Sequence, residues 1–322
     1  MISTLEDRFF RSTCPACGDS SFRSAFSDCN RREGLPLEGT FVRCQGCRSI
    51  YLREIPAPAA LEAAYASAFI DPVTEPEATD GHPANLGVTR GLLRRVSRRV
   101  RGRPHSWPEE EGRSRRILDF GCGSGVKLRE FQARGWSIAG IDLNRPAIQN
   151  ARSLFPDGQW FAGSLEDAPD WGLFDVIRTD NVLEHIPDPR QILSLLRHRL
   201  KPGGRLLAYV PNGRSLSVRL LAARSQASWM PFHLQLLSAR GLMLMLRYAG
   251  FPEVRITQYT PLSWWSMSAR QIVATPGFMR RKPTVIEKVA MTGAKILTPV
   301  WLLSAPLGLG EELIGDASTS RG

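Results

Sequence analysis

The chain has 322 residues, about the length of two domains. Hydrophobic residues make up 43% and charged residues 23%, so a wholly disordered chain and a one-core miniprotein are both excluded. The formal net charge of +11 is compatible with a polyanionic partner, namely nucleic acid, an anionic membrane surface or an acidic glycan, and does not choose among them.

The first feature along the chain is two C-x-x-C pairs. No apolar run follows the charged residues 6–8, so no secretory signal is visible and we expect a cytosolic, reducing compartment. In that setting two such pairs usually hold one tetrahedral Zn²⁺, and disulfides are the less favoured alternative. Four thiolates would close the coordination shell, which predicts a structural metal. The expected ligands are Cys14, Cys17, Cys44 and Cys47.

The residues after the cysteines read as a connector. Residues 61–69 predict a short helix, and residues 71–87 are rich in proline, glycine and acid and predict a linker. Residues 90–103 hold seven arginines with apolar positions at helical spacing, typical of a basic amphipathic helix. Ten arginines against three glutamates between residues 90 and 116 give a local balance of +7, so most of the net charge lies in this connector.

From residue 115 onward short apolar strands alternate with helices. Strands are expected at 115–120, 136–143, 159–163, 174–180, 204–210 and 251–257, with helices between them. This alternation predicts a doubly wound α/β fold, in which helices cover both faces of a mostly parallel sheet. The ligand crevice of such a sheet lies at the carboxyl ends of the strands, where the strand order reverses.

The first strand ends in a glycine-rich turn. Asp119 precedes alternate glycines at 121, 123 and 125, and Asp142 ends the second strand 23 residues later. The glycines allow a tight turn and close approach of a ligand, and Asp142 is placed to accept ribose hydroxyls. Asp119 has the wrong charge for a pyrophosphate and suits a ligand that carries an ammonium or a sulfonium group.

At this point residues 115 to about 260 resemble a class I S-adenosylmethionine-dependent methyltransferase. The matching segments, in family order, are ILDFGCGSG, GIDLN, GSLEDAP, FDVIRTDNVLEHIPDP, LKPGGRLLAYVPN and PFHLQLLSARGLMLMLRYAGF. The resemblance implies a Rossmann-like, doubly wound, seven-stranded, mostly parallel sheet with S-adenosylmethionine as cofactor. It places the methionine part at Asp119 and the glycine turn, the ribose at Asp142, the adenine near Ser164, and the sulfonium above Asn181. The implied cofactor residues are Asp119, Gly121, Cys122, Gly123, Gly125, Asp142, Leu143, Ser164, Leu165 and Asn181.

The cysteine segment is similar to the zinc-binding segment fused to bacterial methyltransferases that act on sugars and surface polysaccharides. CPACG and VRCQGCRSIYL carry this likeness, with Arg48 where the family usually has glycine. The resemblance implies a sugar, glycan or lipid-linked acceptor. The longer C-terminal domain of the sugar C-methyltransferases is absent from this sequence, which favours an oxygen acceptor.

A hydroxyl acceptor calls for a general base that titrates near neutrality, and histidine is the usual choice. His185 in LEHIPDP follows the fourth strand, and His233 in PFHLQLLS precedes the last helix of the predicted core. A structural hydrogen bond is an equally good interpretation of His185. His233 lies on the segment that usually covers the acceptor in this family, so we favour it as the base.

Two other functions remain open at this stage. One is an RNA methyltransferase that binds phosphates through its zinc ribbon and arginine cluster, although the fourth strand lacks an Asn-Pro-Pro-aromatic motif. The other is a non-catalytic cofactor-binding assembly protein.

The apolar tail from 285 to 309 would either pack on the core or lie at an anionic membrane, which would make the protein cytoplasmic and peripheral. The expected segments are a zinc ribbon at 1–55, a helical and basic linker at 56–114, a methyltransferase core at 115–262 and an apolar extension at 263–322.

Overall fold

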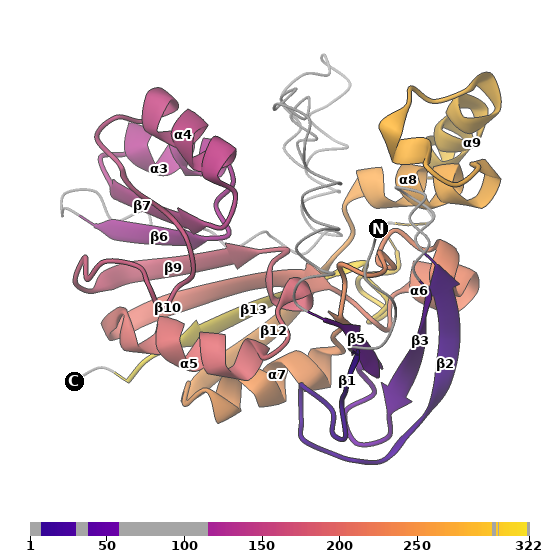
Figure 1. Cartoon of the computed structure of the whole chain (residues 1–322), viewed down its shortest axis with the longest axis horizontal. Helices are drawn as coiled ribbons and strands as arrows, with labels where there is room; N and C mark the ends of the chain where they lie inside the picture. Colours follow the sequence, from indigo (N-terminus) through magenta and orange to yellow (C-terminus); the bar gives the residue numbers. More distant parts are fainter. Residues whose placement is uncertain (1–7, 30–37, 58–114, 298–300, 302, 321–322) are drawn as a thin grey trace. The chain divides into compact units, whose positions relative to one another are not determined.

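The computed structural model describes residues 8–29, 38–57, 115–297, 301 and 303–320 (Figure 1). The predicted short helix at 61–69, the acidic linker and the arginine-rich segment at 90–103 lie outside these residues, as does part of the apolar tail. Within the described part of the chain, no helix has both the length and the apolar composition needed to cross a membrane.

The chain forms two compact units, each assembled from three separate stretches. We call them the cysteine unit, made of residues 1–105, 211–240 and 257–313, and the sheet unit, made of residues 106–210, 241–256 and 314–322. The sequence alone predicted four consecutive segments. The difference arises because the chain leaves the sheet unit after its fifth strand and returns to it twice.

The sheet unit contains a seven-stranded sheet in the order β12-β13-β10-β9-β6-β7-β8. β6 lies near its centre and pairs in parallel with β7 and β9, and the strand order reverses at β6. The predicted doubly wound, mostly parallel sheet is therefore confirmed. The strands are β6 (Arg116–Phe120), β7 (Ser137–Asp142), β8 (Gln159–Ala162), β9 (Phe174–Asp180), β10 (Leu200–Pro211), β12 (Glu253–Tyr259) and β13 (Glu312–Ser318).

The strand β13 comes from the stretch that the sequence assigned to an apolar extension. It lies between β10 and β12, so the sheet includes residues far beyond the predicted core. Arg205 on β10 donates to both carboxylate oxygens of Asp316 on β13, at 3.2 and 2.8 Å. The side chain of Leu246 lies 2.9 Å from where a Cβ on Gly315 would stand, so glycine there lets a helix pack closely on the strand.

Helices cover both faces of this sheet, with α3 and α4 on one face and α5 and α7 on the other (Figure 1). Asn144 caps α4 by accepting from the backbone N–H of Ala147, and Asp188 caps α5. The helices are η1 (Val126–Leu128), α3 (Arg129–Ala133), α4 (Arg145–Leu154), η2 (Leu183–His185), α5 (Pro189–His198) and α7 (Ala239–Tyr248). The core beneath α3 and α4 is buried and apolar, and it includes Ile117, Phe131, Ile148, Phe155 and Trp160.

The cysteine unit holds a four-stranded antiparallel sheet in the order β11-β4-β3-β2. Its edge strand β11 (Gln235–Leu236) comes from the stretch that follows β10, and it pairs with residues next to the second cysteine pair. Met230 and Leu234 from the same stretch pack with Phe41 and Ile50 in one buried core. The other strands are β1 (Arg8–Phe10), β2 (Phe22–Cys29), β3 (Glu38–Cys44), β4 (Ile50–Leu52) and β5 (Glu54–Pro56), and β1 pairs with β5.

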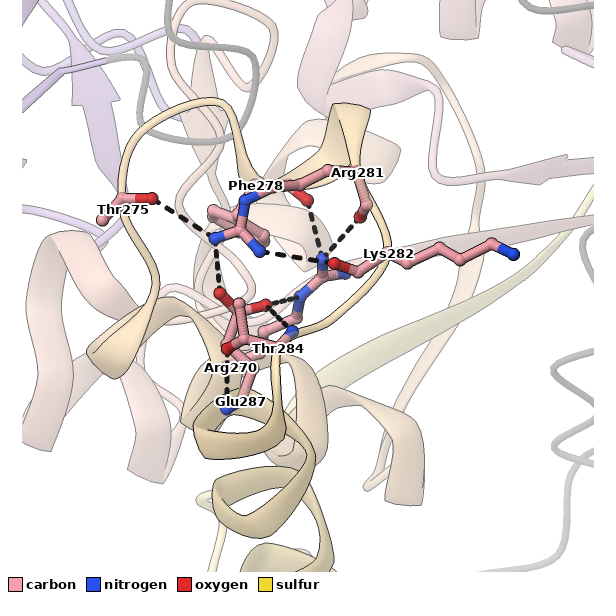
Figure 2. A network of polar contacts seen from close by, with 7 residues as sticks. All are labelled: Arg270, Thr275, Phe278, Arg281, Lys282, Thr284 and Glu287. Atoms are coloured by element: carbon pink, nitrogen blue, oxygen red, sulfur yellow. Dashed lines mark hydrogen bonds and ion pairs between the residues drawn. The ribbon is translucent and has the colours of Figure 1, made fainter.

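Two helices of the cysteine unit, α8 and α9, are joined by an ion-pair network around the buried Glu287 (Figure 2). Arg270 on α8 donates to Glu287 on α9 at 3.0 Å and to the backbone carbonyl of Phe278 at 2.6 Å. Arg281 donates to the other oxygen of Glu287 at 2.5 Å, and Thr284 forms a capping box with the same glutamate. The elements are α6 (Leu216–Leu221), η3 (Ala222–Arg224), α8 (Leu262–Val273), η4 (Phe278–Arg280) and α9 (Val285–Ile296).

Candidate functional site

The turn after β6 adopts the glycine conformation that its sequence predicted. Gly121, Gly123 and Gly125 have φ values of +79°, +53° and +72°, in the left-handed region that favours glycine. A Cβ on Gly121 would lie 2.2 Å from a methyl group of Val182. A Cβ on Gly123 would have nothing within 4 Å, so this residue faces open space among the described atoms.

The carboxylate of Asp142 ties the glycine turn to the end of β7. One oxygen accepts from the backbone N–H of Gly123 at 2.7 Å, and the other accepts from the N–H of Asn144 at 2.8 Å. Each carboxylate oxygen has two lone pairs, so both retain capacity for a ligand hydroxyl. Asp142 therefore shapes the turn and presents acceptors beside it.

Four charged side chains gather where β6 and β9 lie side by side. Arg178 donates to Asp119 at 3.1 Å and also pairs with Asp180, which in turn accepts from Lys127 at 2.6 Å. Asp119 is 1% exposed, and its Oδ1 is a buried oxygen with no hydrogen-bond partner among the residues that the structure describes. Burial raises the pKa of Asp119 to about 6, although the positive charges of Arg178 and Lys127 oppose that rise.

A buried acceptor without a donor is costly, and a ligand that brings a donor would remove the cost. The unpartnered oxygen of Asp119 thus fits the ammonium that the sequence led us to expect, because an ammonium can donate to it and a sulfonium cannot. Arg178 was not predicted as part of the site. The signal for it was a charged residue within the apolar strand sequence FDVIRTD.

The other predicted cofactor residues also lie in the sheet unit. Leu143 is exposed beside Asp142, and Leu165 is buried. Ser164 donates to Asp167 at 2.7 Å, so serine and the neighbouring acid form one polar pair. Asn181 has a φ of +56°, and its side chain donates to Asp180 at 2.7 Å. Cys122 is buried, and burial raises the pKa of its thiol.

The four predicted zinc ligands come together in the cysteine unit. Their Sγ atoms all lie within 4.8 Å of one another, with Cys14 and Cys47 3.6 Å apart and Cys17 and Cys44 3.5 Å apart. Thiolates at the corners of a tetrahedron about 2.3 Å from one ion would be about 3.8 Å apart. All four are free thiols, so the cluster fits structural zinc and not a disulfide pair.

The cysteine cluster is also tied to the residue that precedes α7. Ser238 donates through its hydroxyl to the backbone carbonyl of Cys47, and its N–H donates to Ser49 at 3.0 Å. Ser238 and the second cysteine pair thus belong to one hydrogen-bonded group within the cysteine unit.

The two candidate bases belong to different units. His233 is buried, its Nδ1 lies 2.6 Å from the backbone carbonyl of Ala227, and its ring packs edge-on against Trp229. His185 is half-buried and ends the short helix η2.

Three comparisons relate this chain to known proteins. A family model described as a methyltransferase domain matches residues 92–255. A ubiquinone biosynthesis O-methyltransferase of Thiobacillus denitrificans is 34% identical over 28% of this chain and 41% of its own length. The enzyme of the same name from Idiomarina loihiensis is 26% identical over 52% of this chain and 75% of its own. One similar solved structure is that of phosphoethanolamine N-methyltransferase 2 of Haemonchus contortus in complex with S-adenosylmethionine. It is 16% identical to this chain with a TM-score of 0.46, and the match covers 73% of this chain and 53% of that one.

Proposed function

Because this chain belongs to the methyltransferase-domain family, with S-adenosylmethionine as its cofactor, we propose that it methylates an oxygen of a hydroxyl-bearing acceptor. The observation that carries the proposal is the buried, unpartnered oxygen of Asp119, next to a glycine turn that Asp142 holds in place. The relatives support an oxygen acceptor, since their names describe O-methyltransferases of ubiquinone biosynthesis. Their names lend no support to the sugar or glycan acceptor that the cysteine segment implied.

In the proposed site the side chains bind and orient the cofactor, which supplies a methyl group activated by a sulfonium. Asp142 would accept the ribose hydroxyls, and Ser164 with Leu165 would border the adenine. Asp119 would accept from the cationic methionine part, with Arg178 fixing the direction of its carboxylate. Such alignment contributes much of the acceleration in an in-line displacement.

We propose His233 as the group that takes the acceptor proton. If the ring donates from Nδ1 to the carbonyl of Ala227, at 2.6 Å, then Nε2 carries the lone pair of a base. His185 is the alternative base. A metal held at the four cysteines would not assist either histidine, because four thiolates leave no open position.

Transfer of a labelled methyl group from the cofactor tests this function. Purified protein would be incubated with catechol and phenol acceptors, and separately with cell-envelope extract that contains lipid-linked sugars. A labelled product from catechol or phenol would support a phenolic acceptor. A labelled glycan from the envelope extract would instead support a sugar acceptor. Asp142→Ala should weaken cofactor binding, whereas His233→Ala should leave binding intact and slow transfer. Binding of the cofactor without labelling of any acceptor would contradict the proposal and favour a non-catalytic assembly protein.

We also propose that α9 rests on an anionic membrane. Val285, Ile286, Val289 and Ile296 are exposed on this helix, which also carries basic residues. Apolar residues beside basic ones are typical of helices that lie in a membrane interface. The wild-type protein should cosediment with vesicles containing anionic lipid more than with neutral ones, and Ile286→Glu should abolish the difference. Equal recovery of both proteins in the vesicle pellet would contradict this placement.

A further inference from the structure

Five arginines surround one hollow in the cysteine unit. Arg23 lies on β2 and Arg43 on β3, while Arg48 directly follows Cys47. Arg214 follows β10, and Arg219 lies on α6. Together they line a cavity of about 480 Å³, and every described residue that lines it is an arginine. Its volume is within the range of small-molecule binding pockets.

The arrangement of these arginines is unfavourable without a ligand. Arg23 and Arg43 are directly opposite each other on neighbouring antiparallel strands, where like charges destabilise a sheet. Among the described residues none of the five forms an ion pair. The fold therefore gathers five positive charges with no acidic partner in the described part of the chain, although Arg43 and Arg219 donate to the backbone carbonyls of Arg48 and Arg214.

The backbone of Arg48 adds a second, independent cost. Its φ is +68°, in the left-handed region where glycine is unstrained and a residue with a Cβ is not. Arg48 occupies this position with its side chain exposed and directed at the hollow that it lines. Strain of this kind at a charged residue is typical of a functional position.

We propose that this hollow binds the pyrophosphate group of a small carrier molecule. Guanidinium groups match phosphate oxygens in charge and in the geometry of their paired N–H donors. Five positive charges exceed what one phosphate would neutralise and suit two linked phosphates. A nucleic-acid groove would interleave aromatic side chains for base stacking, and no described aromatic residue lines this hollow. The proposal concerns a site of its own and does not rest on methyl transfer.

Calorimetric titration of the full, zinc-loaded chain with inorganic pyrophosphate tests this site. Wild-type protein should bind one pyrophosphate per chain and bind phosphate more weakly, with affinity that falls as salt is added. Arg43→Gln should raise the Kd at least tenfold. The matched control is Arg240→Gln, which changes an exposed arginine on α7 that does not line the hollow and should leave the Kd unchanged.

Arg48→Gly separates binding from folding. This variant removes one charge and relieves the left-handed strain, so it should weaken pyrophosphate binding at least fivefold while its melting temperature stays equal to the wild-type value or rises. A lower melting temperature combined with unchanged binding would overturn the assignment of Arg48. S-adenosylmethionine binding, measured on the same samples, should not change in either arginine variant.

Two carriers of the same chemistry are distinguished by comparing uridine diphosphate with geranyl diphosphate. Tighter binding of either one than of pyrophosphate, lost in Arg43→Gln, supports the proposal and identifies the carrier as a nucleotide or a prenyl lipid. Absence of pyrophosphate binding to the wild-type chain would overturn it. Tighter binding of a 12-nucleotide RNA than of any diphosphate would overturn it in favour of a nucleic-acid surface.

Discussion

The raised pKa of Asp119 predicts that cofactor binding weakens in mildly acidic solution. Burial raises this pKa to about 6 when the cofactor is absent, and a cationic group against the carboxylate would lower it again. Binding then releases a proton wherever Asp119 starts protonated. If the pKa falls to about 4 on binding, linkage makes the Kd about tenfold larger at pH 5 than at pH 7.5.

Titration calorimetry at the two pH values measures this effect. Performed at pH 5 in two buffers of different ionisation enthalpy, it also counts the proton released. Asp119→Asn should bind weakly at both pH values and release no proton, and Asp157→Asn, at an exposed aspartate after α4, should behave as wild type. S-adenosylhomocysteine has the ammonium without the sulfonium, so an equal pH dependence would assign Asp119 to the ammonium. A wild-type Kd that is the same at pH 5 and 7.5 would refute the reasoning.

The same shift has a consequence for the cofactor-free protein. An aspartate whose pKa is raised on folding disfavours the folded state as pH rises from about 4 through 6, because its ionised form is less well solvated inside. S-adenosylmethionine should therefore raise the melting temperature more at pH 7.5 than at pH 5.

Three further predictions concern the glycine turn, the ion-pair network and the cysteine cluster. Gly121→Ala should weaken cofactor binding on the order of tenfold, because the left-handed backbone is strained with a Cβ and the added methyl group would clash with Val182. Gly135→Ala is the control, because Gly135 has the same φ with open space around it, and its cofactor affinity should not change. Calorimetry measures both affinities. Glu287→Gln should lower the free energy of unfolding by about 3 kcal/mol in urea, because a buried arginine loses its partner. In the wild type, hydrogen bonds from Arg281 and Arg270 lower the pKa of Glu287 to about 2. The stability that this ion pair contributes is therefore lost as pH falls from about 4.5 towards 2. Cys44→Ser should contain less zinc by elemental analysis and melt at a lower temperature than the wild type. Cys29→Ser, which lies outside the four-cysteine cluster, should keep the wild-type zinc content and melting temperature. Unchanged zinc in Cys44→Ser would contradict the tetrahedral site.

The parts of the fold with local signals could be predicted from the sequence. The glycine turn was predictable because its backbone requires glycine, and α5 was predictable because Asp188 and Pro189 mark its start. The cysteine cluster followed from spacing alone. In each case the residues that determine the structure are close together in the sequence.

The parts that escaped prediction depend on pairing between distant segments. β11 has only two residues, and its partner β4 lies more than 180 positions earlier, so no local pattern marks it. The arginine hollow likewise draws on β2, β3 and the stretch after β10, and its members are separate single arginines in the sequence. Arg178 was missed because its importance lies in its partner Asp119, 59 residues away.

The position of β13 affects how the protein is made. Among the described strands β12 is a sheet edge with β13 as its single neighbour, and β13 is synthesised more than fifty residues after it. While a ribosome is still translating that interval, β10 exposes an unpaired edge, and β12 has no partner in the sheet. Unpaired strand edges are where nascent chains associate wrongly. We therefore expect that a translational pause within residues 260–311 promotes aggregation, and that chaperone contact with the nascent chain is greatest over this interval.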